Sequence, residues 1–212
     1  MKHKKLTDFF PHWAIELFSW IMVFVIGFVV AYLITHFVIL KTEIVSGSME
    51  PTIMTTDHVC GNRLAYFFSE PERGDVIFFQ YPYAEEEAAA EGSDPEDIIY
   101  IKRVIGLPGE TVHIRDGAVY INDSETPLDE PYTHGQQTSD RHSKFVDMVI
   151  PDNCYFVMGD NRSVSSDSRV WGFVPRYLIK ARAWLVYWPL DSFHTLDEYT
   201  YDIDETGTKG NN

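Results

Sequence analysis

The sequence predicts a mainly β protein, in which one antiparallel β-sheet domain with a small β-lobe follows a single N-terminal transmembrane helix. Three observations predict this class. Residues 17–40 contain no Asp, Glu, Lys or Arg. Residues 41–195 hold many short apolar runs between Gly and Pro turns, without an internal repeat or a long amphipathic helix. A chain of 212 residues is long enough for one such domain and its anchor.

The N-terminal apolar segment is the first element. Its 24 residues, 17–40, would extend about 36 Å as a helix, enough to cross a hydrocarbon core of about 30 Å. The apolar region of a cleavable signal peptide has only about 7–15 residues, so we expect a retained anchor, with a soluble core helix as the alternative. Three lysines lie within residues 1–16, so the positive-inside rule predicts that this end is cytoplasmic and that residues 41–212 lie outside.

Short strands are predicted in order after the anchor. They fall at residues 57–61, 76–79, 98–105, 111–114, 118–122, 155–158, 171–175 and 183–188, where apolar, β-branched or aromatic residues gather. The turn at 107–110 predicts that the third and fourth runs pair, and Asp116-Gly117 predicts a hairpin between the fourth and fifth. The acidic run 84–97 is expected to form an exposed helical turn or loop.

Net charge limits the partners that this chain can have. The formal charge of -15 argues against nucleic acid. Much of the excess acid lies in 84–97 and in 196–212, and the latter is expected to be a disordered tail. We therefore expect an extracytoplasmic domain over 41–195, in which about 115–150 form a variable lobe.

The two cysteines and the histidines do not form a metal-binding pattern. Cys60 and Cys154 lack CxxC or zinc-ligand spacing. A disulfide between them and two buried thiols both remain open from the sequence. His134 and His142 lie in the same region as Asp140, but we expect surface histidines there, no metal site and no cofactor.

A serine turn directly follows the anchor. Ser48 stands between Gly47 and Met49, with Pro51 three positions on. Glycine permits close backbone approach and proline stiffens the chain, which predicts a non-helical turn that presents Ser48, although a polar linker would have the same composition. Residues 41–47 reach at most about 25 Å when extended, so Ser48 is expected near the outer membrane boundary.

A lysine in an apolar strand is the second candidate. In run 98–105, Lys102 shares a face with Tyr100 and Val104, while Arg103 lies on the opposite face among isoleucines. Burial lowers the pKa of a lysine, and a neutral lysine can act as a general base. The alternative is a lysine at the strand edge with its amine in water.

A hydroxyl-rich loop at 159–169 is the third candidate. It contains Asp160 and Asp167, but their spacing does not match an EF-hand, so a calcium loop is disfavoured. The alternative is a hydrogen-bonding scaffold that positions a catalytic group, in which Ser165 could hold an amine.

Four blocks in this order resemble one family. Ser-Gly-Ser-Met-Glu-Pro-Thr (46–52), Arg-Gly-Asp-Val-Ile (73–77), Tyr-Ile-Lys-Arg-Val-Ile-Gly-Leu-Pro-Gly-Glu (100–110) and the Gly-Asp-Asn-Arg to Trp-Gly stretch (159–172) are similar to blocks of bacterial type I signal peptidases. Each block is weak alone, but four in order behind a single anchor are specific. The segments 84–97 and about 122–150 match no block.

The resemblance implies a role for each matching residue. Ser48 would be the nucleophile and Lys102 its general base, without a histidine or a metal. The Ser46 hydroxyl and the Ser48 backbone N–H would form the oxyanion hole, and Ser165 would orient the base. Asp167 would belong to a structural pair that supports the loop.

Arg169 would be the second member of the structural pair, with Asp167. Val170 stands where the family more often has an aromatic residue, at a position without a chemical role. Ile44, Met49 and Ile101 are expected to line small pockets that accept Ala-x-Ala-like sequences.

The resulting hypothesis is a single-pass endopeptidase of the bacterial cell membrane that removes signal peptides from exported preproteins. Its expected partners are preprotein signal peptides, membrane lipid and the protein-export machinery. A self-cleaving Ser/Lys protease of the repressor type and a non-catalytic relative that binds signal peptides or export machinery are the alternatives. Labelling of Ser48 by an acylating inhibitor would separate them.

Overall fold

The computed structural model describes residues 11–139, 143–196, 199 and 201, and the chain divides into two units between Ile39 and Leu40. The first unit is helical. Helix α1 covers His12–Leu33 and continues as a π-helical turn, η2, over Ile34–Val38. The most apolar 18-residue stretch within His12–Val38 has a mean hydropathy of 2.6, and no residue of α1 is buried within the described chain. These properties are consistent with a membrane anchor.

The helix lies slightly N-terminal to the predicted segment 17–40. It begins directly after Pro11, whose φ of -63° and ψ of 146° mark the extended residue before the first turn. It ends before Ile39, whose φ of -104° and ψ of 126° are extended. Apolar composition alone cannot locate this end, because the first strand is as apolar as the helix.

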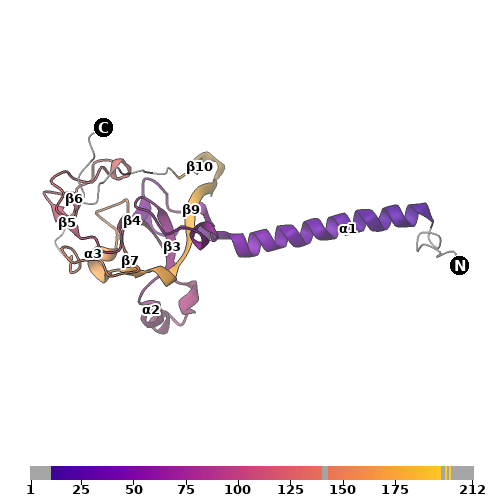
Figure 1. Ribbon diagram of the computed structural model, residues 1–212, viewed down its shortest axis with the longest axis horizontal. Helices are drawn as coiled ribbons and strands as arrows, with labels where there is room; N and C mark the ends of the chain where they lie inside the picture. The colour runs from indigo at the N-terminus through magenta and orange to yellow at the C-terminus, as the bar shows by residue number, and fades with distance from the viewer. Residues whose placement is uncertain (1–10, 140–142, 197–198, 200, 202–212) are drawn as a thin grey trace. The chain divides into compact units, whose positions relative to one another are not determined.

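The second unit is built around an antiparallel sheet, shown in Figure 1. Its strands are β1 (Ile39–Glu43), β2 (His58–Asn62), β3 (Val76–Gln80), β4 (Ile99–Gly106), β7 (Cys154–Met158), β8 (Val174–Pro175), β9 (Ile179–Trp188) and β10 (His194–Thr195). In the described residues the order is β1-β2-β9-β3-β4-β7-β8, and β10 also pairs with β9. A separate pair, β5 (Val112–Arg115) and β6 (Ala118–Ile121), forms the small lobe. The predicted mainly β class is confirmed.

Helices are short in this unit. They are α2 (Ala84–Glu91), α3 (Ser168–Trp171) and the 3-10 turns η3 (Gly47–Met49), η4 (Ala65–Phe67), η5 (Pro95–Asp97), η6 (Pro131–Thr133), η7 (Arg176–Leu178) and η8 (Leu190–Ser192). Helix α3 replaces the start of the strand predicted at 171–175, because the Asp167 carboxylate caps the backbone N–H of Arg169.

The pairing predicted between runs 98–105 and 111–114 is wrong. Strand β4 pairs with β3 on one edge and β7 on the other, so neither edge is free for β5. The turn at 107–110 is held by Glu110, whose carboxylate accepts from the Leu107 N–H at 2.7 Å and pairs with Arg73 at 2.5 Å. The hairpin predicted through Asp116-Gly117 is confirmed.

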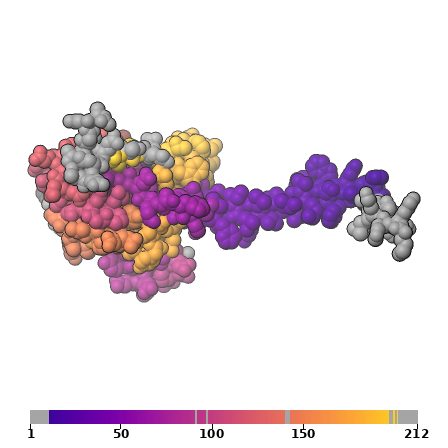
Figure 2. All heavy atoms as spheres, in the orientation of Figure 1, coloured from indigo at the N-terminus to yellow at the C-terminus, as the bar shows by residue number. Residues whose placement is uncertain are grey.

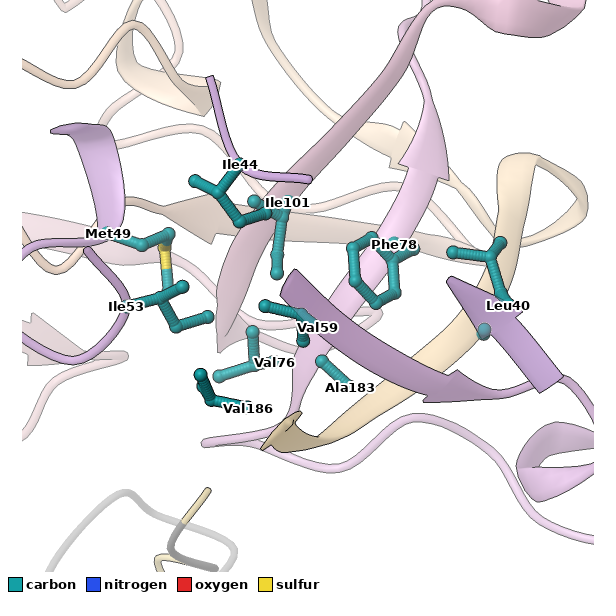
Figure 3. Packing of buried hydrophobic residues seen from close by; sticks show 11 residues of the cluster. Leu40, Ile44, Met49, Ile53, Val59, Val76, Phe78, Ile101, Ala183 and Val186 are labelled. Carbon is teal, nitrogen blue, oxygen red and sulfur yellow. The ribbon is translucent and has the colours of Figure 1, made fainter. Parts of the chain in front are cut away.

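Three clusters of buried side chains form the core. One of them, in Figure 3, joins β1, β2, β3, β4 and β9 and includes Ile44, Met49 and Ile101. Of the predicted tail, Leu196 packs against this cluster, and Tyr199 and Tyr201 pack against a second cluster that includes the small lobe. The other residues of 196–212 lie outside the described residues.

Both cysteines are free thiols. Cys60 lies on β2 and Cys154 begins β7, and β9, β3 and β4 lie between these strands in the sheet. At about 4.8 Å per strand the separation is about 19 Å, far beyond the Cα distance of a disulfide. Asp140 and His142 lie outside the described residues, and within those residues no group of three or more His, Cys, Asp or Glu could hold a metal ion.

Candidate active site

The turn that carries Ser48 is closed by backbone hydrogen bonds. The N–H of Ile44 donates to the Asp57 carbonyl at 2.8 Å, and the N–H of Thr56 donates to the Ile44 carbonyl at 2.7 Å. These bonds fix both ends of the loop between β1 and β2. The hydroxyl of Thr55 and the Glu50 carboxylate add a bond of 2.9 Å within the loop. Ser48 lies in η3 and is 8% exposed.

Strand β4 brings Lys102 to this serine. The Lys102 Nζ lies 2.8 Å from the Ser48 Oγ and 2.8 Å from the Ile101 carbonyl. Lys102 is 4% exposed, so the amine is almost dehydrated. Burial lowers the pKa of Lys102 to about 8, against the opposing charges of Asp167 and Asp160. A buried amine beside a hydroxyl can accept its proton, which activates the oxygen as a nucleophile.

Ser46 lies on the open side of the pair. Its hydroxyl is 3.3 Å from the Ser48 Oγ, and Ser46 is exposed. A hydroxyl there can donate to an oxygen that develops negative charge beside Ser48.

The loop after β7 holds the serine turn from the other side. The N–H of Asn161 donates to the Ser48 carbonyl at 3.1 Å, and the Asn161 side-chain amide donates to the Gly47 carbonyl at 3.1 Å. Gly159 lies so close that a Cβ there would clash with the Ser48 carbonyl and the Ser165 Oγ. Only glycine therefore permits this close approach of the two loops.

Ser165 lies beside Gly159, and no hydrogen bond joins it to Lys102 within the described residues. Its Oγ is buried and has no hydrogen-bond partner within the described residues. An unsatisfied buried hydroxyl is costly and leaves an acceptor for a neighbouring N–H donor. Ser165 also lies close to the Ser48 carbonyl. That Ser165 orients the Lys102 amine stays a prediction.

Asp167 and Arg169 form a buried ion pair. The Arg169 Nε and one terminal nitrogen each lie 2.8 Å from a different oxygen of Asp167. The Asp167 carboxylate also accepts from the Gly159 N–H at 3.1 Å, and Arg169 donates to the Arg162 carbonyl at 3.0 Å. The pair therefore connects both ends of the loop.

Sequence reasoning missed a second buried ion pair. Arg103 donates to both oxygens of Asp160, at 2.8 and 2.6 Å, and both side chains are 1% exposed. Asp160 also accepts from the Thr52 hydroxyl at 2.5 Å, so it connects β4 to the loop of Ser48. Although burial opposes the charged guanidinium, the bonds and charge of Asp160 raise the pKa of Arg103. The sequence held a signal for this pair, because Arg103 lies on the apolar face of a predicted strand. A buried charge there requires a partner of opposite charge.

A cleft opens beside Ser48 and Lys102. Its volume is about 390 Å³, and its walls come from residues 42–46 and 99–102 with Phe78, Glu87, Val164 and Ser166. Ile44 and Ile101 line the cleft, and their part in a substrate pocket stays a prediction. Met49 is not among the lining residues, because it is fully buried in the core cluster.

Known proteins resemble the chain over most of its length. The model of the family described as signal peptidase, peptidase S26, matches residues 17–188. A signal peptidase I of Leptolyngbya laminosa is 39% identical over 163 residues, which are 77% of this chain and 75% of the relative. A probable signal peptidase I-2 of Synechocystis is 36% identical over 157 residues, which are 74% of this chain and 66% of that protein.

One solved structure gives a further comparison. The crystal structure of a signal peptidase I from Enterococcus faecalis is 30% identical, with a TM-score of 0.40, and the match covers 54% of this chain and 97% of the other.

Proposed function

Because the chain belongs to the signal peptidase family, peptidase S26, we propose that it is a serine endopeptidase that removes signal peptides from exported preproteins. The observation that carries this proposal is the distance of 2.8 Å between the Ser48 Oγ and the buried Lys102 Nζ. The signal peptidase names of the relatives support the reaction class.

In the proposed mechanism, Lys102 takes the proton of Ser48 as the Oγ attacks the scissile carbonyl. The Ser48 N–H and the Ser46 hydroxyl stabilise the oxyanion, and Lys102 then gives its proton to the leaving amine. In the second half, Lys102 removes a proton from water as the water oxygen attacks the acyl ester. Lys102 then gives this proton to the Ser48 Oγ as the ester bond breaks, which regenerates the free serine and the neutral amine. The free hydroxyl of Ser165 would accept a hydrogen bond from Lys102 during the reaction and so fix the direction of the amine, while Asp167 and Arg169 hold the loop.

The cleft supports a preference for small side chains. Strand-like segments 42–46 and 99–102 flank it, and an extended substrate between them would alternate its side chains. Ile44 and Ile101 restrict the pockets for the first and third residues before the cleaved bond, and Met49 supports this wall from the core. The second residue would point away, so an Ala-x-Ala-like sequence fits best.

We expect the purified full chain in detergent to cut a preprotein peptide after Ala-x-Ala. Replacement of the last alanine by leucine or phenylalanine should lower kcat/KM at least about 100-fold, because a closed pocket cannot accept the added volume. Mass spectrometry of the products locates the cut. Ile101→Ala should partly restore cleavage of the leucine peptide, and equal kcat/KM for alanine and leucine peptides in the unmodified enzyme would contradict this assignment.

The pKa of Lys102, about 8, predicts the acidic limb of the pH profile. Lys102 must be neutral to accept the serine proton, so kcat/KM should fall about tenfold per pH unit below that value. A plateau should follow above it. The measurement uses a peptide without titratable side chains, and His58→Gln serves as the control. If the acidic limb of the profile disappeared in His58→Gln but remained when Lys102 was replaced, Lys102 would be excluded as the general base.

We further propose that α1 anchors the enzyme in the cell membrane with its N-terminus in the cytoplasm and the second unit outside. The three N-terminal lysines support this orientation, and preprotein, lipid and export machinery would meet the enzyme there. Protease added to intact, wall-stripped cells should degrade the second unit, whereas degradation only after lysis would reverse the orientation.

A further inference from the structure

A second cavity lies beside the cleft, under helix α2. Its volume is about 560 Å³. The lining is mostly aromatic and charged and includes Tyr81, Tyr83, Glu86, Glu87, Lys144 and Trp171. Helix α2 stands at the surface of its unit in Figures 1 and 2, and residues 84–97 match none of the four family blocks. The cavity is therefore built partly from a segment that lies outside the four blocks.

Three aromatic rings meet edge to face in the wall. The ring of Tyr81 lies 5.7 Å from that of Trp171, at 87°, and 5.8 Å from that of Tyr83, at 64°. Rings arranged in this way present faces in several directions to one open surface cavity. Such faces carry partial negative charge and attract a cation. They also pack well against the methylene stem of a long basic side chain.

Two carboxylates add formal negative charge at the same place. The Glu87 oxygens lie 3.4 Å from the Tyr100 hydroxyl, a long distance for a hydrogen bond, and Glu86 forms no ion pair within the described residues. Burial raises the pKa of Tyr81, and the charge of Glu87, Tyr83 and Glu86 raises it further. The lining therefore carries two carboxylates and one ammonium group, that of the exposed Lys144, so its formal charge is negative.

A buried donor without an acceptor also belongs to this wall. Trp171 is 6% exposed, and its indole N–H has no partner within the described chain. A buried N–H of this kind is rare and costs free energy until an acceptor reaches it. A peptide carbonyl that accompanies a bound side chain would supply that acceptor.

The cavity and the cleft are neighbours that share one wall residue. Glu87 lines both of them. The loop that supplies Val164 and Ser166 to the cleft continues into Val170 and Trp171 at the second cavity. A peptide that extends from Ser48 along this loop would bring a side chain towards the aromatic rings.

We propose that this cavity binds a lysine or arginine side chain of the preprotein, from a residue close to the cleaved bond. The inference rests on the proposed function and adds a second specificity determinant to it. The aliphatic stem would pack on Tyr81 and Tyr83, and the cationic head would pair with Glu86 and Glu87.

The test uses Ala-x-Ala peptides in which a lysine or a glutamine is placed in turn at each position from four before to four after the cleaved bond. We expect one position at which lysine raises kcat/KM about five- to tenfold over glutamine, mainly through KM. At that position Glu86→Gln should reduce the ratio towards one, and Glu86→Lys should reverse it. High salt should reduce the ratio as well.

Glu85→Gln is the matched control, because Glu85 is an exposed neighbour on α2 that does not line the cavity. It should leave the ratio of lysine to glutamine peptides unchanged. An equal drop with Glu85→Gln would show only a general effect of acidic surface charge and would overturn the site. A ratio of one at every position would also overturn it. Failure to cut any glutamine peptide would instead contradict the proposed function.

Discussion

Replacement of Ser48 by alanine or of Lys102 by methionine should each lower kcat by about 10⁴-fold or more, and the double variant should be no slower than either single one. The reason is that the two side chains act as one unit, at 2.8 Å between Oγ and Nζ. Single-turnover assays on an Ala-x-Ala peptide measure the loss. Near-normal turnover in either single variant, or losses that multiply, would exclude this pair.

Unfolding measurements separate this loss of activity from a loss of structure. At pH 7 a lysine is charged in the unfolded chain, while burial lowers the pKa of Lys102 from 10.5 to about 8 in the folded protein. The unfolded state binds more protons between these two values, so this group opposes folding below about pH 8, and stability rises between the two. Lys102→Met should therefore raise the free energy of unfolding at pH 7 by about 3 kcal/mol. An inactive but less stable variant would contradict burial of the amine.

The second large effect is expected at Asp160. Asp160→Asn leaves the guanidinium of Arg103 buried, at 1% exposure, without its charge partner, and such a change costs about 3–5 kcal/mol. Denaturant titration of the full chain in detergent measures it. Because the charge of Asp160 also raises the pKa of Lys102, any remaining activity should have its acidic limb at lower pH.

Glu70→Gln is the matched control for that variant. It breaks the ion pair between Glu70 and Arg176 at 2.6 Å, in which the glutamate is 72% exposed. Exposed pairs contribute only about 0–1 kcal/mol. Similar destabilisation by the two substitutions would show that the buried pair has no special part in holding β4 to the loop of Ser48.

Much of the fold could be predicted because its signals are local. A run of apolar, β-branched and aromatic residues identified β4, and an Asp-Gly turn identified the β5–β6 hairpin. Strand β1 was not separable from the helix before it, since Ile39 and Leu40 are as apolar as the anchor. The partners of β4 depend on residues far along the chain, and a nearby turn therefore suggested the wrong one.

The candidate site likewise contains residues that local sequence reveals and residues that only distant contacts reveal. Ser48 and Lys102 stand out in the sequence because each is an unusual residue in its local context. Asp160 looked like one acid among hydroxyls, and its pairing with Arg103 depends on contact across 57 positions. The aromatic cavity was also missed, because Tyr81 and Trp171 meet only after β3 and α3 have been positioned.

The short connection between the apolar helix and Ser48 has a kinetic consequence. Residues 39–47 allow the nucleophile to stand at most about 32 Å from the end of the proposed span. A preprotein held in the same bilayer is confined to that layer, so its effective concentration at the cleft would approach the millimolar range that short tethers give. Tight binding is then unnecessary, and weak binding lets both products leave quickly. Short soluble peptides lack this confinement, so their KM values should greatly exceed the concentration of preprotein needed in a membrane.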